Sequence, residues 1–487
     1  MADEPTPETP DSGEEPIKQR KNGLYPGVSD ELAENMRSGW ADTGLHDLRP
    51  IAQAAHTAAR REALSTRFPG ERLVVPAGNL KTRANDTEYR FRAATEYAYL
   101  TGNQTEDGVL VLEPRDGGEG HDATLYLLPR SDRENGEFWL SGQGELWVGR
   151  RHSLEEAAAL YGVPTGDVRE LPGRLSGAIG PVRVVRGHDA GVDRALTDKV
   201  TAERDEELRV FLSEARLVKD DFEIAELEKA CASTARGFED VVRVLDKAEA
   251  TSERYIESTF FLRARVEGND VGYGSICAAG PHACTLHWVR NDGPVRSGDL
   301  LLLDAGVETG ELYTADVTRT LPISGTFTDL QRKIYDAVYE AQEAGIAAVK
   351  PGAAFRDFHD AAQRVLAERL VEWGLLEGPV ERALELGLQR RWTLHGTGHM
   401  LGMDVHDCAA ARTGAYVGGT LRPGMCLTVE PGLYFQADDL TVPEEYRGVG
   451  VRIEDDILVT EDGNRNLSEA LPRRSDEVEA WMAALRG

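Results

Sequence analysis

HGTGHMLGMDVHD (395–407), LTVEPG (427–432) and GVRIEDD (450–456) are the stretches on which the organisation of this chain depends. Each of them places histidine or carboxylate side chains where divalent metal ions could bind. Upstream, LLLLDAGVETGELYTADVTRT (300–320) contributes two aspartates to the same set. Carboxylates and imidazoles are the usual ligands of hydrolytic metal sites, and this set is large enough for two ions.

The upstream aspartates are expected at the end of a strand pair. Leu300–Leu303 form an unbroken apolar run, which is typical of a strand covered on both faces, and this strand delivers Asp304 at its end. Gly306 and Gly310 suit a turn before Asp316. Antiparallel pairing would then bring the two carboxylates side by side.

The alternation in GVRIEDD predicts a polar strand face. Arg452, Glu454 and Asp456 fall on one side, and apolar residues fall on the other. A buried Glu454 needs a charge partner, and a metal ion together with Arg452 would supply one.

The histidines of HGTGH are expected on an extended loop. His395 and His399 have the spacing of a helical ligand pair, but the glycines between them disfavour a helix. One histidine of this group would bind metal, which leaves His395 and His406 near the substrate as hydrogen-bond donors or proton carriers. His287 is a weaker candidate, because a histidine beside Trp288 is more often a packed side chain.

An internal repeat relates the two carboxylate regions. RSG, five residues and DAG (296–306) match RPG, five residues and EPG (422–432), and a second acid follows each copy, Asp316 in one and Glu454 in the other. This pattern predicts two similar αβ halves that each give a strand pair to a shared site. The alternative is a chance likeness of two turn-strand units, since glycine and proline punctuate such units routinely.

Composition describes a globular protein with substantial cores. The chain has 487 residues, 41% of them hydrophobic, and a formal net charge of −29. Nucleic acid or an anionic membrane would require a basic face, so neither is expected as a partner. No apolar run approaches a membrane span, and the acidic, proline-rich N-terminus differs from a signal peptide, which predicts a cytoplasmic protein. The five cysteines lack a CxxC pair and are expected to be buried free thiols.

Four segments are expected. Residues 1–44 form an acidic extension whose composition predicts disorder, and 45–200 form an α/β domain. Residues 201–217 are a charged helical connector, and 218–487 carry the site. Strands are expected in the second segment at 73–78, 108–114, 123–129 and 144–149, followed by a helix at 153–162.

Helices in the last segment are predicted from caps and apolar spacing. Asp220 with Glu223 begins an amphipathic helix, and further helices are expected at 252–266, 328–349 and 355–373.

These motifs resemble the creatinase, prolidase and methionine aminopeptidase superfamily of pita-bread metallopeptidases, most closely its Xaa-Pro aminopeptidase (aminopeptidase P) family. The likeness runs from about residue 60 to the C-terminus. It rests on RFPGERLVVPAGN, FRAATEYAYLTGN, LHWVRND, LLLDAGVETGELYTADVTRT, HGTGHMLGMDVHD, LTVEPGLYF and VPEEYRGVGVRIEDDI.

The resemblance implies an α/β (α+β) architecture, in which a creatinase-like N-terminal α/β domain is followed by a pita-bread catalytic domain. It also implies two divalent metal ions, most often manganese, and a homodimer or homotetramer. The implied metal ligands are Asp304, Asp316, His399, Glu430 and Glu454, and the implied substrate-side histidines are His287, His395 and His406.

The implied activity is release of the N-terminal residue from peptides with proline in second position. In the resembling mechanism Asp304 holds one metal, His399 and Glu430 hold the other, and Asp316 and Glu454 bridge them. A hydroxide that bridges the metals is the nucleophile, and Glu430 carries its proton to the proline nitrogen. His406 and His287 steady the carbonyl oxygen, and Arg452 partners the metal carboxylates.

Three alternatives remain. A prolidase would cleave only dipeptides, but it needs cationic groups for the substrate carboxylate, and the connection 431–453 is acidic and holds only Arg447 and Arg452. A non-catalytic pita-bread binding protein and a metal-independent creatinase-type hydrolase both lose ligands in their families, whereas this chain keeps all five.

Overall fold

The computed structural model describes residues 29–117, 119–134, 136–177 and 180–487. The chain divides into two units, Met1–Val200 and Thr201–Gly487. Both units combine helices and strands, as expected for an α/β (α+β) protein. The expected disorder of residues 1–28 lies outside the described part of the chain.

A five-stranded mixed sheet forms the centre of the first unit, with the strand order β6-β5-β4-β1-β7. The β1 strand pairs antiparallel with β4 and parallel with β7. Residues 77–181 separate β1 from β7 in the sequence, so the sheet brings together distant parts of the chain. Helix α6 begins with the predicted capping box of Ser153 and Glu156 and ends at Gly162 in the left-handed region. The main elements are α2 (Ala54–Arg67), β1 (Arg72–Pro76), β2 (Thr82–Ala84), β3 (Thr87–Glu88), α3 (Thr95–Thr101), β4 (Val109–Pro114), β5 (His121–Leu127), α6 (Leu154–Tyr161), β6 (Thr165–Asp167), α7 (Leu171–Ser176), β7 (Val182–Val184) and α8 (Ala190–Ala195).

The strand predicted at 144–149 is wrong. These residues form the short helix α5 (Glu145–Val148), which follows α4 (Glu137–Leu140). The Trp147 indole donates to the Trp139 carbonyl at 2.8 Å, and the Arg151 amide donates to the Glu145 carboxylate at 2.6 Å. Local hydrogen bonds therefore decide the conformation of a run that is too short for its periodicity to distinguish one helical turn from a strand.

Part of the acidic extension is helical. Helix α1 (Asp30–Met36) begins at Ser29, whose side chain accepts the Leu32 amide, and it buries none of its residues. The Trp40 ring packs edge to face on Phe138, with ring centroids 5.2 Å apart. Disorder was expected through residue 44, so the structure differs from that expectation at this point.

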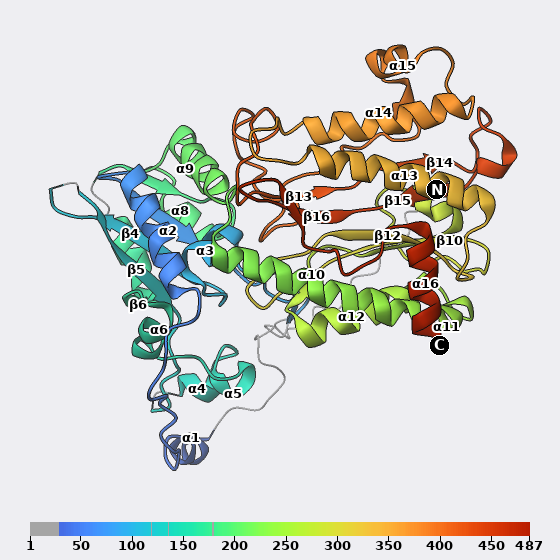
Figure 1. Ribbon diagram of the computed structural model, residues 1–487. Helices are drawn as coiled ribbons and strands as arrows, with labels where there is room; N and C mark the ends of the chain where they lie inside the picture. Colours follow the sequence, from blue (N-terminus) through green and yellow to red (C-terminus); the bar gives the residue numbers. More distant parts are fainter. Residues whose placement is uncertain (1–28, 118, 135, 178–179) are drawn as a thin grey trace, which may run out of the picture. The chain divides into compact units, whose positions relative to one another are not determined.

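Two helix pairs frame the strands of the second unit (Figure 1). Helix α10 (Asp221–Val242) begins with the predicted Asp220 and Glu223 capping box and packs with α12 (Glu253–Glu267). Helix α13 (Asp329–Ala348) has a capping box of Thr328 and Gln331 and packs with α14 (Asp357–Glu372). The first pair contacts strands of the first half, and the second pair contacts strands of the second half. The other helices are α9 (Ala202–Ala215), α11 (Leu245–Glu249), η2 (Gly280–Cys284), α15 (Val380–Leu386), η3 (Leu388–Arg391), η4 (Glu444–Tyr446) and α16 (Ser475–Arg486).

One antiparallel strand pair repeats in the two halves, as the sequence predicts, and the third strand of each sheet joins a different member of the pair. One three-stranded sheet has the order β12-β10-β9, and the other has the order β13-β16-β17. Gly298 and Gly424, which occupy equivalent places in the repeat, both adopt the left-handed backbone, with φ of 95° and 85°. The strands of the two halves are β8 (Asp270–Val271), β9 (Ile276–Ala279), β10 (Leu300–Ala305), β11 (Val307–Glu308), β12 (Val317–Pro322), β13 (Cys426–Val429), β14 (Gly432–Phe435), β15 (Val449–Arg452), β16 (Asp455–Val459) and β17 (Asn464–Asn466).

Buried polar contacts join the halves. The Glu454 amide donates to the Thr318 carbonyl at 3.1 Å. Arg319 and Asp455, both without exposed side-chain surface, form an ion pair at 2.8 Å. Removing either partner would leave an uncompensated buried charge, so this pair fixes how β12 and β16 meet.

All five cysteines are buried free thiols, which confirms the prediction from their spacing. Among the described residues, no helix has the length and apolar character needed to cross a membrane.

Candidate active site

The first pair of predicted carboxylates comes from β10 and β12. These strands pair antiparallel with Asp304 opposite Thr318, so Asp316, just before β12, lies beside the end of β10. Tyr273 donates its hydroxyl proton to Asp304 Oδ1 at 2.6 Å, and Arg452 of the other half donates to Oδ2. The antiparallel pairing expected from the sequence is confirmed, and Asp304 also receives donors from two distant segments.

The second pair comes from β13 and β16. Val429 lies opposite Asp455, and the next position of the same register holds Glu430 and Glu454. The Thr318 hydroxyl donates to Glu454 Oε2 at 2.6 Å. The sequence suggested Arg452 as a charge partner of Glu454, but the ion pair of Arg452 is with Asp304.

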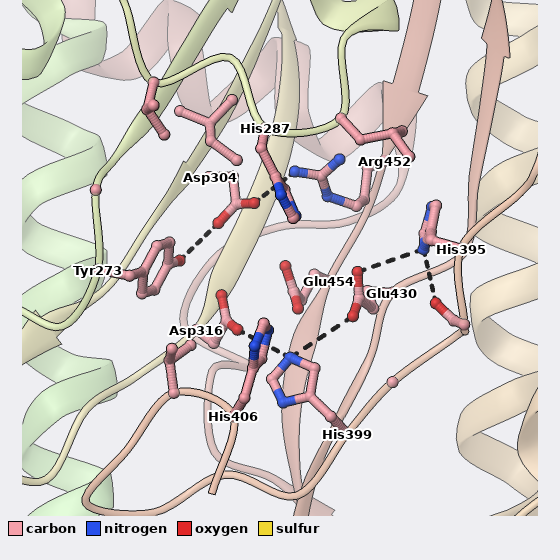
Figure 2. Close-up of a pocket in the computed structure, with 17 residues that line it drawn as sticks. Tyr273, His287, Asp304, Asp316, His395, His399, His406, Glu430, Arg452 and Glu454 are labelled. Carbon is pink, nitrogen blue, oxygen red and sulfur yellow. Dashed lines mark hydrogen bonds and ion pairs between the residues drawn. The ribbon is translucent and has the colours of Figure 1, made fainter. Parts of the chain in front are cut away.

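His399 joins the carboxylates of the two halves (Figure 2). Its Nε2 lies 3.3 Å from Asp316 Oδ2 and 3.7 Å from Glu430 Oε1. Ligand atoms of Asp316, His399 and Glu454 all lie within 4.8 Å of one another. The His399 Nδ1–H donates to the Met400 carbonyl at 3.1 Å, which leaves Nε2 directed at the carboxylates.

The electrostatics of this cluster favour cations. Burial raises the pKa of Glu430 to about 7, although His399 and Arg452 oppose the shift. Burial, and then the negative charges of Asp316 and Glu430, hold the pKa of Glu454 well above its usual range. Buried carboxylates that repel one another are stabilised by a divalent ion, so the donor set fits metal binding.

His395 belongs to a chain of hydrogen bonds beside the carboxylates. Arg452 donates to the Tyr434 hydroxyl oxygen at 3.1 Å, and that hydroxyl lies 2.8 Å from His395 Nε2. The His395 Nδ1 lies 2.6 Å from the Gly396 carbonyl oxygen, which must accept, so Nε2 is the acceptor for Tyr434. Burial and the charge of Arg452 lower the pKa of His395 to about 4, so the ring is neutral.

A cavity of about 620 Å³ contains all the predicted site residues. His287 lines it despite its neighbour Trp288, and the His406 ring meets the His399 ring edge to face at 4.3 Å between centroids. Burial, and then the charge of His399, lower the pKa of His406. The lining includes Tyr273, Ile276, Leu286, His287, Val289, Asp304, Asp316, His395, His399, Val405, His406, Glu430, Arg452 and Glu454.

The loop that carries His395 and His399 is extended, as predicted, and is held on both edges. Its Thr397 carbonyl accepts the Glu430 amide at 2.8 Å. The Thr397 amide donates to Nδ1 of His359, on α14, at 3.2 Å. A Cβ at Gly398 would lie 1.9 Å from the Thr428 carbonyl oxygen, so only glycine lets the loop approach β13 this closely.

Sequence reasoning missed Tyr273, Tyr434, Thr318 and His359. The role of Tyr434 could have been predicted from the sequence, because strand alternation after Glu430 puts this residue on the same face as the metal carboxylates. The same alternation after Asp316 points to Thr318, whereas Tyr273 and His359 reach the site from segments with no motif of their own.

Two family descriptions match this chain. Residues 225–461 match metallopeptidase family M24, and residues 57–184 match the aminopeptidase P N-terminal domain.

Named relatives agree with this architecture. The chain is 85% identical over 99% of its length to Xaa-Pro aminopeptidase 1 of Streptomyces coelicolor, covering 98% of that protein. The structure of Pseudomonas aeruginosa aminopeptidase PepP superposes with a TM-score of 0.80 at 32% identity, covering 90% of this chain and 100% of that one. Zinc-substituted Escherichia coli aminopeptidase P in complex with product has the same TM-score of 0.80 and 32% identity, covering 90% of this chain and 100% of that one. The creatinase-like domain followed by a pita-bread domain is therefore confirmed.

The protonation of His399 in the metal-free protein tests this geometry. Burial alone would lower its pKa, but the Asp316 contact and the negative charges around it raise the pKa to about 9. Asp316→Asn removes the main charge that favours the imidazolium, so the His399 pKa should fall below 7. Imidazole ¹⁵N shifts recorded between pH 5 and 10 would measure both values. A wild-type His399 that titrates near its ordinary pKa of about 6.5 would contradict the ion pair.

Proposed function

Because the chain belongs to the Xaa-Pro aminopeptidases of metallopeptidase family M24, we propose that its cavity releases the N-terminal residue from peptides with proline in second position. The protein is a metal-dependent hydrolase. The observation that carries the proposal is the buried cluster of Asp316, His399 and Glu454, in which both halves of the fold supply ligands to one point.

We assign five residues to two divalent ions. His399 and Glu430 would hold one ion, Asp304 would hold the other, and Asp316 and Glu454 would contact both. Support comes from the ligand atoms of Asp316, His399 and Glu454, which lie within 4.8 Å of one another, and from the unfavourable burial of the carboxylates without cations. Four carboxylates and one imidazole make a hard ligand set, which favours manganese.

The bound ions would supply Lewis-acid polarisation of the scissile carbonyl and acidify water. Glu430 is our proposed proton carrier. Its carboxylate lines the cavity, 3.7 Å from His399 and from His395, where it could accept a proton from the attacking water and give it to the proline nitrogen. The nitrogen of an Xaa-Pro bond is tertiary and, like any peptide nitrogen, it must be protonated before the C–N bond breaks.

The histidines of the cavity would position the substrate. His287 and His406 are proposed to hydrogen-bond the carbonyl oxygen as negative charge develops on it. Both ring nitrogens of His395 already have partners, so His395 would bind substrate only by exchanging one of them. Arg452 is proposed to hold Asp304 in place.

The placement of arginines favours an aminopeptidase over a prolidase. Among the described residues that line the cavity, Arg452 has the only guanidinium, and Asp304 engages it. Arg447 donates to the carbonyls of Asp439 and Val442. Neither arginine of the connection 431–453 is therefore available for the carboxylate of a dipeptide.

Further features remain proposals. We propose a homodimer or homotetramer on the family resemblance, and a cytoplasmic protein because five buried free thiols suit a reducing compartment. We also propose that 45–200 and 218–487 are the creatinase-like and pita-bread domains, with 201–217 as their connector and 1–44 as an extension.

Metal removal should abolish activity. Exhaustive chelation and dialysis are expected to stop cleavage of Ala-Pro-Ala, and Mn²⁺ should restore it better than Zn²⁺ or Mg²⁺ because the ligands are mostly carboxylates. Product release by chromatography and metal content by mass spectrometry provide the measurement. Full activity in protein without detectable metal would refute the assignment.

Glu430→Gln should lower kcat on the order of 10²- to 10⁴-fold, since the amide keeps the shape of the side chain and cannot carry a proton. His406→Ala is expected to act in the same direction more mildly. Metal content is measured for both variants, so that loss of a ligand is separated from loss of the base. Near-normal kcat in a metal-loaded Glu430→Gln protein would place the proton carrier elsewhere.

Peptide length separates the two exopeptidase activities. Values of kcat/KM for Ala-Pro, Ala-Pro-Ala and a longer Ala-Pro peptide should favour the tripeptide and the longer substrate, because the one arginine among the described residues of the cavity lining already pairs with Asp304. A strong preference for Ala-Pro would make the enzyme a prolidase.

A further inference from the structure

A second hollow adjoins the active-site cavity. Its volume is about 1050 Å³, at the upper end of the range of small-molecule sites, and α14, α15 and η3 form its walls. His395 and Gly396 line both spaces, so the hollow continues the cavity past the end where His395 stands. We call this hollow the arginine groove.

The arginine groove is cationic within an acidic protein. Three arginines, Arg356, Arg364 and Arg390, line it against two carboxylates, Asp360 and Glu385. Arg364 has a loose ion pair with Glu381 at 3.5 Å, on the outer side of the groove. Among the described residues, Arg356 and Arg390 form no ion pair, and both are exposed. The chain as a whole carries a net charge of −29, so this excess of positive charge is local.

One polar group of the groove wall can bind the peptide backbone. His359 accepts the Thr397 amide on Nδ1, so its proton is on Nε2 and is available to donate.

We propose that the arginine groove binds the substrate beyond its proline and favours a carboxylate there, either the C-terminus or an acidic side chain. The inference rests on the proposed exopeptidase function. His359 offers a donor to the peptide backbone, and Arg356 and Arg390 offer the positive charge. Leu386 and Leu394, 56% and 64% exposed, give the groove apolar walls.

Charge complementarity sets the direction of the substrate. Asp304 and Tyr273 stand at the opposite side of the carboxylate cluster from His395 (Figure 2). The N-terminal ammonium group is attracted to the carboxylates, and a downstream carboxylate is attracted to the guanidinium groups. An exopeptidase that accepts long peptides needs an open path on the downstream side only, and the groove is such a path.

The test uses peptides that share Ala-Pro-Ala at their N-terminus. Asp is placed at the fourth, fifth or sixth residue, with Asn and Lys peptides as matched comparisons, and each peptide is made with a free and an amidated C-terminus. The variants are Arg356→Gln with Arg390→Gln, and the control Arg382→Gln, an exposed arginine of α15 that does not line the groove.

At one or more positions, wild-type kcat/KM should be about three- to tenfold higher for the Asp peptide than for the Asn peptide, since two exposed ion pairs contribute only modestly to the free energy of substrate binding. The free C-terminus should surpass the amide by a similar factor if the C-terminal carboxylate is the group bound. The double variant should lose these preferences, Arg382→Gln should keep them, and raised salt should weaken them in the wild type.

Two results would overturn the inference. One is equal kcat/KM for Asp, Asn, free and amidated peptides in the wild type. The other is a carboxylate preference that survives in the double variant or is lost equally in Arg382→Gln. Failure of the proposed function looks different, because wild-type protein would then leave Ala-Pro-Ala uncleaved.

Discussion

The structure depends on a cluster of carboxylates that are buried close together, away from water. Asp304, Asp316, Glu430 and Glu454 lie in one pocket with a single guanidinium, that of Arg452, and burial raises the pKa of three of them. A protein can retain such a cluster only if cations compensate it or if the rest of the fold holds the carboxylates together at a cost in stability. The pocket is therefore a preformed site for positive charge, and the hydrogen bonds around it keep each carboxylate in place.

The repeat explains how this cluster is assembled. Each half gives an antiparallel strand pair that ends in two acids, and contacts between the halves lock the pairs against each other. The buried Arg319 and Asp455 pair lies directly behind the metal carboxylates, on the opposite side of their strands. The four carboxylates thus lie in or beside strands, which place side chains more accurately than loops do, and hydrogen bonds hold the loop that carries His399.

His359 links the catalytic loop with the arginine groove. Its Nδ1 holds the amide of Thr397, between His395 and His399, and its ring lines the groove. Substrate bound in the groove would contact the same histidine that supports the loop. His359 would therefore contribute both to recognition of the downstream substrate and to the position of the catalytic histidines.

The sequence by itself determined the elements that depend on local chemistry. Capping boxes at Asp220 and Thr328, the apolar run before Asp304 and the glycines of HGTGH predicted helices, a buried strand and a loop that the structure contains. The run at 144–149 was mispredicted because it is short and side-chain contacts decide it. Motif spacing also identified the acids and histidines that the cavity brings together.

Only the tertiary structure decided which partner each of these groups has. Arg452 pairs with Asp304, 148 residues away, and not with the neighbouring Glu454. Tyr273, Thr318 and His359 bond to partners in distant segments, and Arg356 and Arg390 line the adjoining groove only because α14 and η3 pack beside the cavity. Sequence periodicity reports the face on which a residue lies, whereas hydrogen bonds and charge pairs depend on distances that are set when separate elements pack.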